Sequence, residues 1–208
     1  MHHFFNCFDM QQIDQSVFFF LNGLHNQFFD AFFWYATKGV IYLPLYLVAA
    51  YLAYKQFGKR FWLLFLFVVL TVLLTDQCCD LIKQTVCRLR PSNDPAIASL
   101  VHVVNGYTGG DYGFPSAHAC NTFGMAVFLY CVIRPKRWGL TLALFTWAAI
   151  MSYSRIYLGV HYPSDILCGA TLGLSIGLGM TFIIRRLKIY FAPNFFSTKS
   201  ITSSDGGA

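Results

Sequence analysis

The sequence has little charge. Only 12% of its 208 residues are Asp, Glu, Lys or Arg, whereas 56% are hydrophobic and 18% are aromatic. A soluble globule needs more polar surface, and none of the long apolar stretches carries a charged helix face that would cover a soluble core. This shortage excludes an ordinary soluble domain and indicates an integral membrane protein.

The sequence also lacks the patterns that hold metals. Its seven cysteines form no CxxC pair and no Cys/His metal spacing, and the segments between apolar stretches contain no carboxylate cluster suited to magnesium. We therefore expect no metal and no other cofactor. The cysteines are predicted to be buried free thiols, with a Cys87–Cys120 disulfide as the alternative.

A basic stripe with interleaved aromatics is missing as well, so the net charge of +6 does not indicate nucleic-acid binding. The basic residues gather instead at alternate ends of the apolar stretches. By the positive-inside rule these ends are cytoplasmic, and the other ends face the periplasm if the membrane is a bacterial inner membrane. The three clusters are Lys55, Lys59 and Arg60; Arg134, Lys136 and Arg137; and Arg185, Arg186 and Lys188.

Five apolar stretches approach the length of about 20 residues that crosses a bilayer. They predict an all-α, polytopic bundle of five transmembrane helices within a domain at residues 39–190. The stretches are residues 39–54, 61–75, 119–133, 139–153 and 166–184.

Three further segments complete the predicted organisation. Polar residues interrupt the apolar segment within residues 1–38, and its stripe of Ile13, Val17, Leu21, Leu24 and Phe28 is typical of helices lying in the membrane interface. A sixth span is the alternative. The outer loop 91–115 is predicted to form a short helix on the lipid surface and to act as a substrate lid. Residues 191–208 are predicted to be a disordered cytoplasmic tail.

Two polar clusters flank the outer loop. Lys83 and Arg90 are seven residues apart and are predicted to project from one face of a single helix, where they would bind phosphate or merely anchor the helix among lipid headgroups. Ser116, Ala117 and His118 precede the third span, at a helix N-terminus that favours anions. Each cluster alone is equally compatible with a purely structural role.

The third cluster, residues 154–165, is more specific. Arg155 can donate paired hydrogen bonds to phosphate, and Asp165 follows His161 at i+4. A carboxylate bound to one imidazole nitrogen fixes the tautomer and leaves the other nitrogen free to attack phosphorus. Asp76 and Asp80 are predicted to pair with Lys83, and Arg88 is predicted to meet lipid headgroups or the substrate.

Three motifs together resemble the three-part signature of the type 2 phosphatidic acid phosphatase (PAP2) family. They are Lys83-x6-Arg90-Pro91, Pro115-Ser116-Ala117-His118 and Ser154-Arg155-x5-His161-x3-Asp165. The resemblance implies that His161 is the nucleophile, Asp165 orients it and His118 is the general acid and base. It also implies that Lys83, Arg90, Ser116 and Arg155 hold the phosphoryl oxygens, together with Ala117, where the family usually has glycine.

The expected function is therefore metal-independent hydrolysis of a lipid phosphate through a phosphohistidine. Small bacterial members of the family suggest lipid A phosphate or undecaprenyl pyrophosphate as substrate, with phosphatidylglycerophosphate or phosphatidic acid as alternatives. The expected partners are the bilayer and this lipid, and no obligate protein partner is evident. A transporter that moves the lipid without hydrolysis is a rival from another class, and a haloperoxidase is a rival on the same scaffold.

Overall fold

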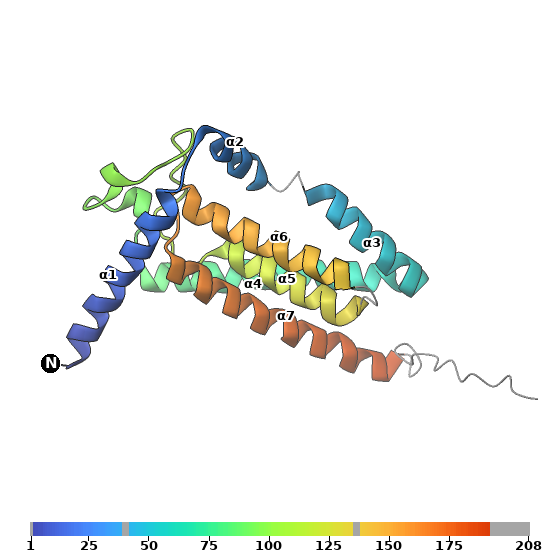
Figure 1. Ribbon diagram of the computed structural model, residues 1–208. Helices are drawn as coiled ribbons and strands as arrows, with labels where there is room; N and C mark the ends of the chain where they lie inside the picture. The colour runs from blue at the N-terminus through green and yellow to red at the C-terminus, as the bar shows by residue number, and fades with distance from the viewer. Residues whose placement is uncertain (1, 39–41, 135–137, 192–208) are drawn as a thin grey trace, which may run out of the picture.

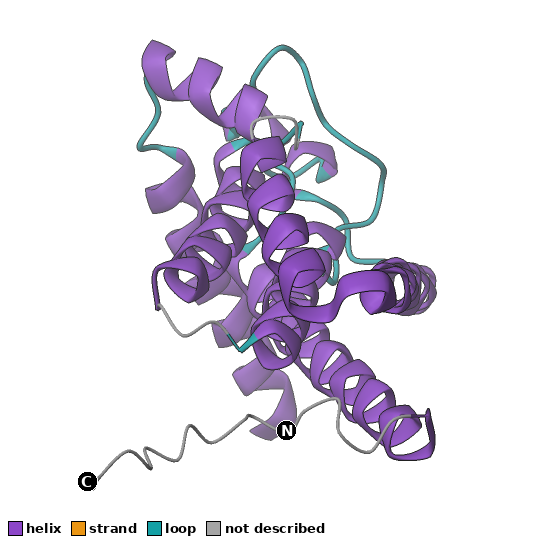
Figure 2. Cartoon of the chain, turned by 90° about the vertical axis from the view of Figure 1, so that its right-hand side faces the viewer, coloured by secondary structure: helices purple, strands orange, loops and turns teal. Residues whose placement is uncertain are grey.

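The computed structural model describes residues 2–38, 42–134 and 138–191. In this part of the chain every element of regular secondary structure is a helix (Figure 2). The α-helices are α1 (His2–Asn22), α2 (Gln27–Ala36), α3 (Leu43–Phe57), α4 (Phe61–Val86), α5 (Ala117–Ile133), α6 (Trp138–Tyr157) and α7 (Pro163–Phe191). Short 3-10 helices are η2 (Gly58–Arg60), η3 (Pro91–Asn93) and η4 (Ala98–Leu100). The predicted all-α class is confirmed.

Helices α4 to α7 lie side by side as the main bundle, while α1 runs obliquely across the end where α4 and α6 finish and α7 begins (Figure 1). The largest apolar core lies inside this bundle and includes Phe67, Phe128, Leu144 and Trp147. On the outside, large apolar side chains such as Leu73 are exposed. Such a surface is suited to lipid rather than to water.

Helices α5 and α7 share the most extensive interface of the bundle. Gly169, Gly173 and Gly177 recur every four residues on α7 and face the backbone of α5, so closely that an added Cβ would clash with the carbonyls of Ser116, Cys120 and Gly124. Small residues at this spacing let helix backbones approach in a membrane. This contact fixes the start of α7 against the start of α5.

The predicted spans correspond to α3 to α7, but several helices extend further toward the loop-rich end. Helix α4 continues to Val86, α6 continues to Tyr157 and α7 begins at Pro163. By length and hydropathy, two helical stretches of the described residues could cross a membrane, 43–86, which runs through η2, and 163–187. The count of five spans stays a prediction.

The N-terminal segment forms two helices, as predicted. Ile13, Val17, Leu24 and Phe28 of the predicted apolar stripe are exposed, whereas the polar side chains of Asp14 and Asn22 are buried against the bundle. Asn22 donates to the carbonyls of His102, Ile156 and Tyr157, which docks the end of α1 on the end of α6. The buried face of α1 therefore combines these polar side chains with the apolar ring of Phe18.

The predicted helix in the outer loop is wrong. The loop contains only the 3-10 turns η3 and η4, and Ile97, Val101 and Val104 are buried against the protein instead of resting on lipid. Their partners include Phe18 of α1 and Ile156 of α6, so the loop is sandwiched between α1, α2 and α6. Leu100 is the exposed exception.

The cysteines whose side chains are described are free thiols, as predicted, but only Cys79 and Cys120 among them are buried, and Cys168 is exposed. Cys87 is exposed, Cys120 is buried, and neither belongs to a disulfide. Cys7 and the predicted tail beyond residue 191 lie outside the residues whose side chains are described.

Candidate active site

The three sequence motifs meet at one end of the bundle. Backbone hydrogen bonds tie them together: the Ser116 amide donates to the Asp165 carbonyl at 3.0 Å, the Ser92 amide to the Gly159 carbonyl at 3.0 Å, and the Gly113 amide to the Arg88 carbonyl at 2.8 Å. Residues from α4, α5, α6 and α7 are thereby held in one place, although up to 82 positions separate them in sequence, from Lys83 to Asp165.

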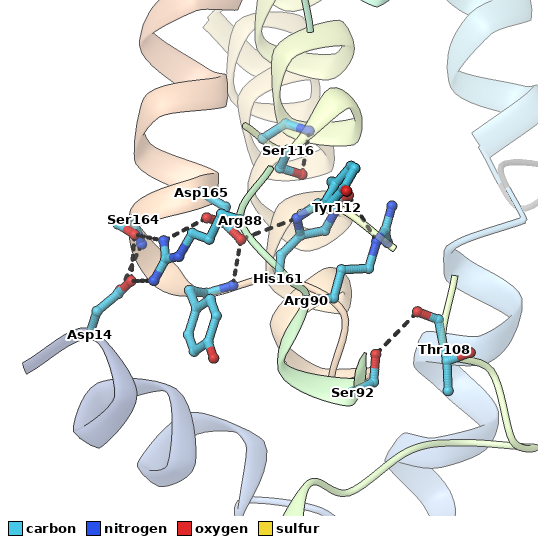
Figure 3. A network of polar contacts seen from close by, with 12 residues as sticks. Asp14, Arg88, Arg90, Ser92, Thr108, Tyr112, Ser116, His161, Ser164 and Asp165 are labelled. Carbon is cyan, nitrogen blue, oxygen red and sulfur yellow. Dashed lines mark hydrogen bonds and ion pairs between the residues drawn. The ribbon is translucent and has the colours of Figure 1, made fainter. Parts of the chain in front are cut away.

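His161 lies in the turn between α6 and α7. The turn reverses at Gly159, whose φ of +76° is left-handed and whose missing side chain lets Val101 and the His102 carbonyl approach. His161 Nδ1 is 3.4 Å from Asp165 Oδ2, and both side chains are buried (Figure 3). Because Nδ1 faces the carboxylate, Nε2 is the nitrogen left for chemistry. The predicted i+4 contact is therefore present as a close approach, in which Nδ1 makes no hydrogen bond within the described residues.

Asp165 is held on both of its oxygens. Oδ2 accepts from the Tyr162 amide at 2.9 Å, and Oδ1 accepts from Arg88 Nη1 at 2.8 Å. Asp165 is fully buried, and a buried carboxylate remains charged only when it is paired and hydrogen-bonded. Arg88 supplies that pairing, and although burial outweighs it and raises the pKa of Asp165 to about 6, the carboxylate is charged near pH 7.

Arg155 and Arg90 present buried donors that have no partner among the described residues. Arg155 is 2% exposed and donates to Thr37 Oγ1 and to Tyr107 Oη, yet its Nε is unpaired. Arg90 donates from Nε to the Tyr112 carbonyl at 3.1 Å, while its Nη1 is unpaired. Neither guanidinium is in an ion pair within the described part of the chain.

The two guanidinium groups also influence each other. Burial, and then the positive charge of Arg155, lower the pKa of Arg90. Folding is expected to bring two buried cations together only where an anion compensates them. A phosphate, with three oxygens available to paired N–H donors, fits such a position.

These cations shape the acid–base behaviour of both histidines. Burial, followed by the charges of Arg90, Arg155 and Lys83, lowers the pKa of His161 well below its usual value. Burial and then the charge of Arg155 lower the pKa of His118, which precedes the predicted span 119–133, to about 3. His161 is therefore neutral near pH 7, the form in which an imidazole is nucleophilic.

Ser116 is the N-cap of α5. Its Oγ accepts from the Ala119 amide at 3.4 Å, and its hydroxyl proton remains available to a ligand. Ala117 opens the helix and has no left-handed backbone conformation, so alanine is accommodated where the family usually has glycine. The first amides of α5 and the positive end of its dipole favour an anion here.

One prediction about the first motif is wrong. Lys83 and Arg90 do not share a helix face, because α4 ends at Val86 and Cys87 takes a left-handed conformation (φ 51°). Arg90 lies beyond that break, in a strand-like segment where Leu89 forms a β-bridge with Tyr112. Lys83 Nζ is 3.1 Å from Asp80, as predicted, whereas Asp76 accepts a hydrogen bond from Asn121.

Sequence reasoning also misplaced Arg88. It was predicted to meet lipid headgroups or the substrate, but its guanidinium donates to Asp14, Ser164 and Asp165 within the protein. Asp14 was not identified as a site residue, although a carboxylate inside an apolar helix is a recognisable signal of function. The α7 glycines were missed too, although their spacing is a known packing pattern.

Comparisons with known proteins agree with this geometry. The family model described as "PAP2 superfamily" matches residues 60–189. Lipid A 4′-phosphatase of Bacteroides thetaiotaomicron is 42% identical over 181 residues, which cover 86% of this chain and 80% of that protein. Lipid A 4′-phosphatase of Porphyromonas gingivalis is 33% identical over 168 residues, covering 80% of this chain and 70% of that protein.

Solved structures share the fold. The transmembrane PAP2 type phosphatidylglycerolphosphate phosphatase of Bacillus subtilis matches with a TM-score of 0.65 at 20% identity, covering 86% of this chain and 88% of that chain. LpxE of Aquifex aeolicus matches with a TM-score of 0.60 at 23% identity, covering 80% of this chain and 93% of that chain. The chain belongs to the PAP2 superfamily.

Proposed function

We propose that this membrane lipid phosphatase removes a phosphate from the sugar headgroup of a lipid A-type glycolipid, at the periplasmic face of a bacterial inner membrane, through a phosphohistidine on His161. Its membership of the superfamily and its similarity to lipid A 4′-phosphatases over most of its length make it a membrane lipid phosphatase. The observation that carries the proposal is the pair of buried donors on Arg90 and Arg155 that lack a partner among the described residues, together with two neutral histidines whose pKa these cations lower.

The proposed first step transfers the phosphoryl group to the enzyme. The lone pair of His161 Nε2 bonds to phosphorus while the bond from phosphorus to the sugar oxygen breaks, and protonated His118 gives its proton to that oxygen. Bound phosphate offsets the charges of Arg155 and Arg90, which raises the pKa of His118 toward the range that a general acid needs.

The second step returns the enzyme to its starting state. Neutral His118 takes a proton from water as the water oxygen bonds to phosphorus, and the bond from phosphorus to nitrogen breaks to release phosphate. Arg90, Arg155, Lys83, Ser116 and the Ala117 amide hold the non-bridging oxygens through both steps. Stabilising their charge is the main requirement of phosphoryl transfer.

A cavity between α2 and the outer loop, one aromatic contact away from Tyr107, favours a sugar-bearing substrate. It has a volume of about 380 Å³ and is lined in part by Trp34, Tyr35, Asp30 and Asn105. The Trp34 ring lies 6.0 Å from the ring of Tyr107, whose hydroxyl accepts from Arg155 at 2.9 Å. Aromatic faces and polar side chains together suit a sugar ring, which lipid A has and undecaprenyl pyrophosphate lacks.

The proposed orientation follows from the charge distribution. Lys59 and Arg60 of η2, Arg134 after α5, and Arg185 and Arg186 near the end of α7 lie at the end of the bundle opposite to His161 (Figure 1). Basic residues remain cytoplasmic, so the site faces the periplasm.

Phosphate release by detergent-purified protein tests the proposal. The panel is lipid A phosphorylated at either sugar, undecaprenyl pyrophosphate, phosphatidylglycerophosphate and phosphatidic acid. We expect the wild type to prefer lipid A, and His161→Ala and His118→Ala to fall to background. The carboxylate-to-amide variant Asp94→Asn, in the loop at the same end of the bundle, serves as a control for handling and folding.

Two results would overturn the proposal. If His161→Ala released phosphate at the wild-type rate, His161 would not be the nucleophile. A preference for undecaprenyl pyrophosphate would contradict the assignment of a sugar headgroup to the substrate. Binding of every lipid without release of phosphate would favour a transporter.

A further inference from the structure

Asp14 of α1 is a buried carboxylate at the edge of the active site and lies outside the residues that the family model matches. Its Oδ1 accepts from the Ser164 amide at 2.9 Å, and its Oδ2 accepts from Arg88 Nη2 at 2.6 Å and from the Ser164 hydroxyl (Figure 3). Helix α1 thus makes polar contacts with the start of α7 through this side chain, beside the packing of Phe18 on Tyr162.

Arg88 joins Asp14 to Asp165. One amino group of its guanidinium binds Asp14, and the other binds Asp165 Oδ1 at 2.8 Å and Ser164 Oγ at 2.7 Å. The group also lies 4.1 Å from the centre of the Tyr162 ring, a distance at which a cation and an aromatic face attract each other. Burial opposes the charge of Arg88, but Asp165 and Asp14 outweigh it and raise the pKa of Arg88.

Asp14 also caps α7. Ser164 is the second residue of that helix, and its amide is one of those that the helix itself leaves without a partner. A carboxylate from another helix satisfies it and is stabilised by the positive end of the helix dipole. Asp14 therefore fixes the backbone from which Asp165 projects, as well as the arginine that holds Asp165.

We propose that Asp14 is a positioning residue of the active site, which acts through Arg88 and the start of α7 to keep Asp165 Oδ2 directed at His161. This inference rests on the function proposed above. Arg88 prefers to bind a carboxylate with two parallel hydrogen bonds. While Asp14 occupies Nη2, Arg88 binds Oδ1 of Asp165 alone. Without Asp14, the arginine is free to engage both oxygens and to compete with His161 for Oδ2.

The central experiment compares Asp14→Asn with the wild type in lipid A hydrolysis and in phosphohistidine formation, using labelled substrate and an alkaline quench that preserves the phosphohistidine. The amide keeps an oxygen for the Ser164 amide but loses the charge that holds Arg88. We expect kcat and the rate of phosphohistidine formation to fall by between about tenfold and a hundredfold, with KM changed by less than about threefold.

Asn22→Ala is the matched control for a purely structural role. Asn22 docks α1 through three hydrogen bonds to backbone carbonyls but does not contact Arg88. We expect this variant to lower the melting temperature at least as much as Asp14→Asn while kcat stays within about twofold of the wild type. Equal loss of kcat in both variants would show that Asp14 only docks α1, and would overturn the proposal.

A double-mutant cycle tests whether Asp14 acts through Arg88. Asp14→Asn combined with Arg88→Met should be no slower than Arg88→Met alone, because residues that act through one contact are not additive. Additive losses would contradict the proposed route. His161→Ala separates the two hypotheses: if it is inactive and Asp14→Asn behaves as wild type, only the role of Asp14 fails, whereas an active His161→Ala removes the catalytic proposal itself.

Discussion

The two sides of the active site hold their charges in opposite ways. On one side, Arg88 lies between two carboxylates and its guanidinium is hydrogen-bonded to Asp14, Ser164 and Asp165. On the other side, Arg90 and Arg155 lie near each other, each with a buried nitrogen that lacks a partner among the described residues. Only two positions separate Arg88 from Arg90 in sequence.

This contrast distinguishes an arginine that supports the structure of the site, Arg88, from two arginines that are proposed to bind phosphate, Arg90 and Arg155. Compensated charges stabilise the folded chain and keep Asp165 ionised, whereas uncompensated ones cost stability and await an anion. The same residue type thus serves two purposes, and substitutions at the two sides should affect activity and stability differently. The predictions below test that difference, from the largest expected effect to the smallest.

Arg90→Met should lose the most activity while keeping stability. The substitution removes one donor to the phosphoryl oxygens, which we expect to lower kcat/KM by about 10²–10³-fold. It also removes a buried cation from beside Arg155, so the melting temperature should stay the same or rise. Calorimetry in detergent and phosphate release measure the two quantities. A large fall in melting temperature would show that Arg90 has a structural anion partner.

Arg88→Met should lose both activity and stability. It leaves Asp14 and Asp165 buried without their cation. Breaking a buried pair costs about 3–5 kcal/mol, and we expect roughly 2 kcal/mol here because 25% of the Arg88 side chain is exposed. Activity should fall by about tenfold to a hundredfold. If Arg88→Met were as stable as Arg90→Met, the distinction between the two sides would be wrong.

Sequence alone predicted the parts of the molecule that depend on short-range patterns. Apolar runs and basic clusters indicated the helices, and the i+4 spacing of His161 and Asp165 indicated their contact. The break at Cys87 escaped prediction because the pairing of Leu89 with Tyr112 turns the chain there, and that partner is 23 positions away. The link from Asp14 to Arg88 spans 74 positions, so no local spacing could indicate it.

Trp34→Ala should change the choice of substrate more than the chemistry. If the cavity beside Tyr107 binds the sugar headgroup, loss of the Trp34 ring should lower kcat/KM for lipid A by about tenfold, in line with the energy of one aromatic contact. Hydrolysis of undecaprenyl pyrophosphate should stay nearly unchanged, which provides an internal control. Equal losses on both lipids would indicate that Trp34 acts by supporting Tyr107 and Arg155.

The smallest expected effect is a dependence of stability on pH that comes from His161. Burial and then the charges of Arg90, Arg155 and Lys83 lower the pKa of His161 in the folded protein, whereas the unfolded chain binds a proton with a pKa of about 6.5. Below about pH 6.5 the unfolded chain therefore carries a proton on His161 that the folded chain lacks, so this histidine lowers the stability of the fold as the pH falls, whereas Asp165, whose pKa burial raises to about 6, acts in the opposite direction. His161→Gln should remove the contribution of His161 to the dependence of stability on pH, and Arg90→Met should lessen that contribution by raising the pKa of His161.

Melting temperatures measured in detergent between pH 7.5 and 5 would check this. A pH dependence in Arg90→Met equal to that of the wild type would contradict the proposed influence of Arg90 on His161.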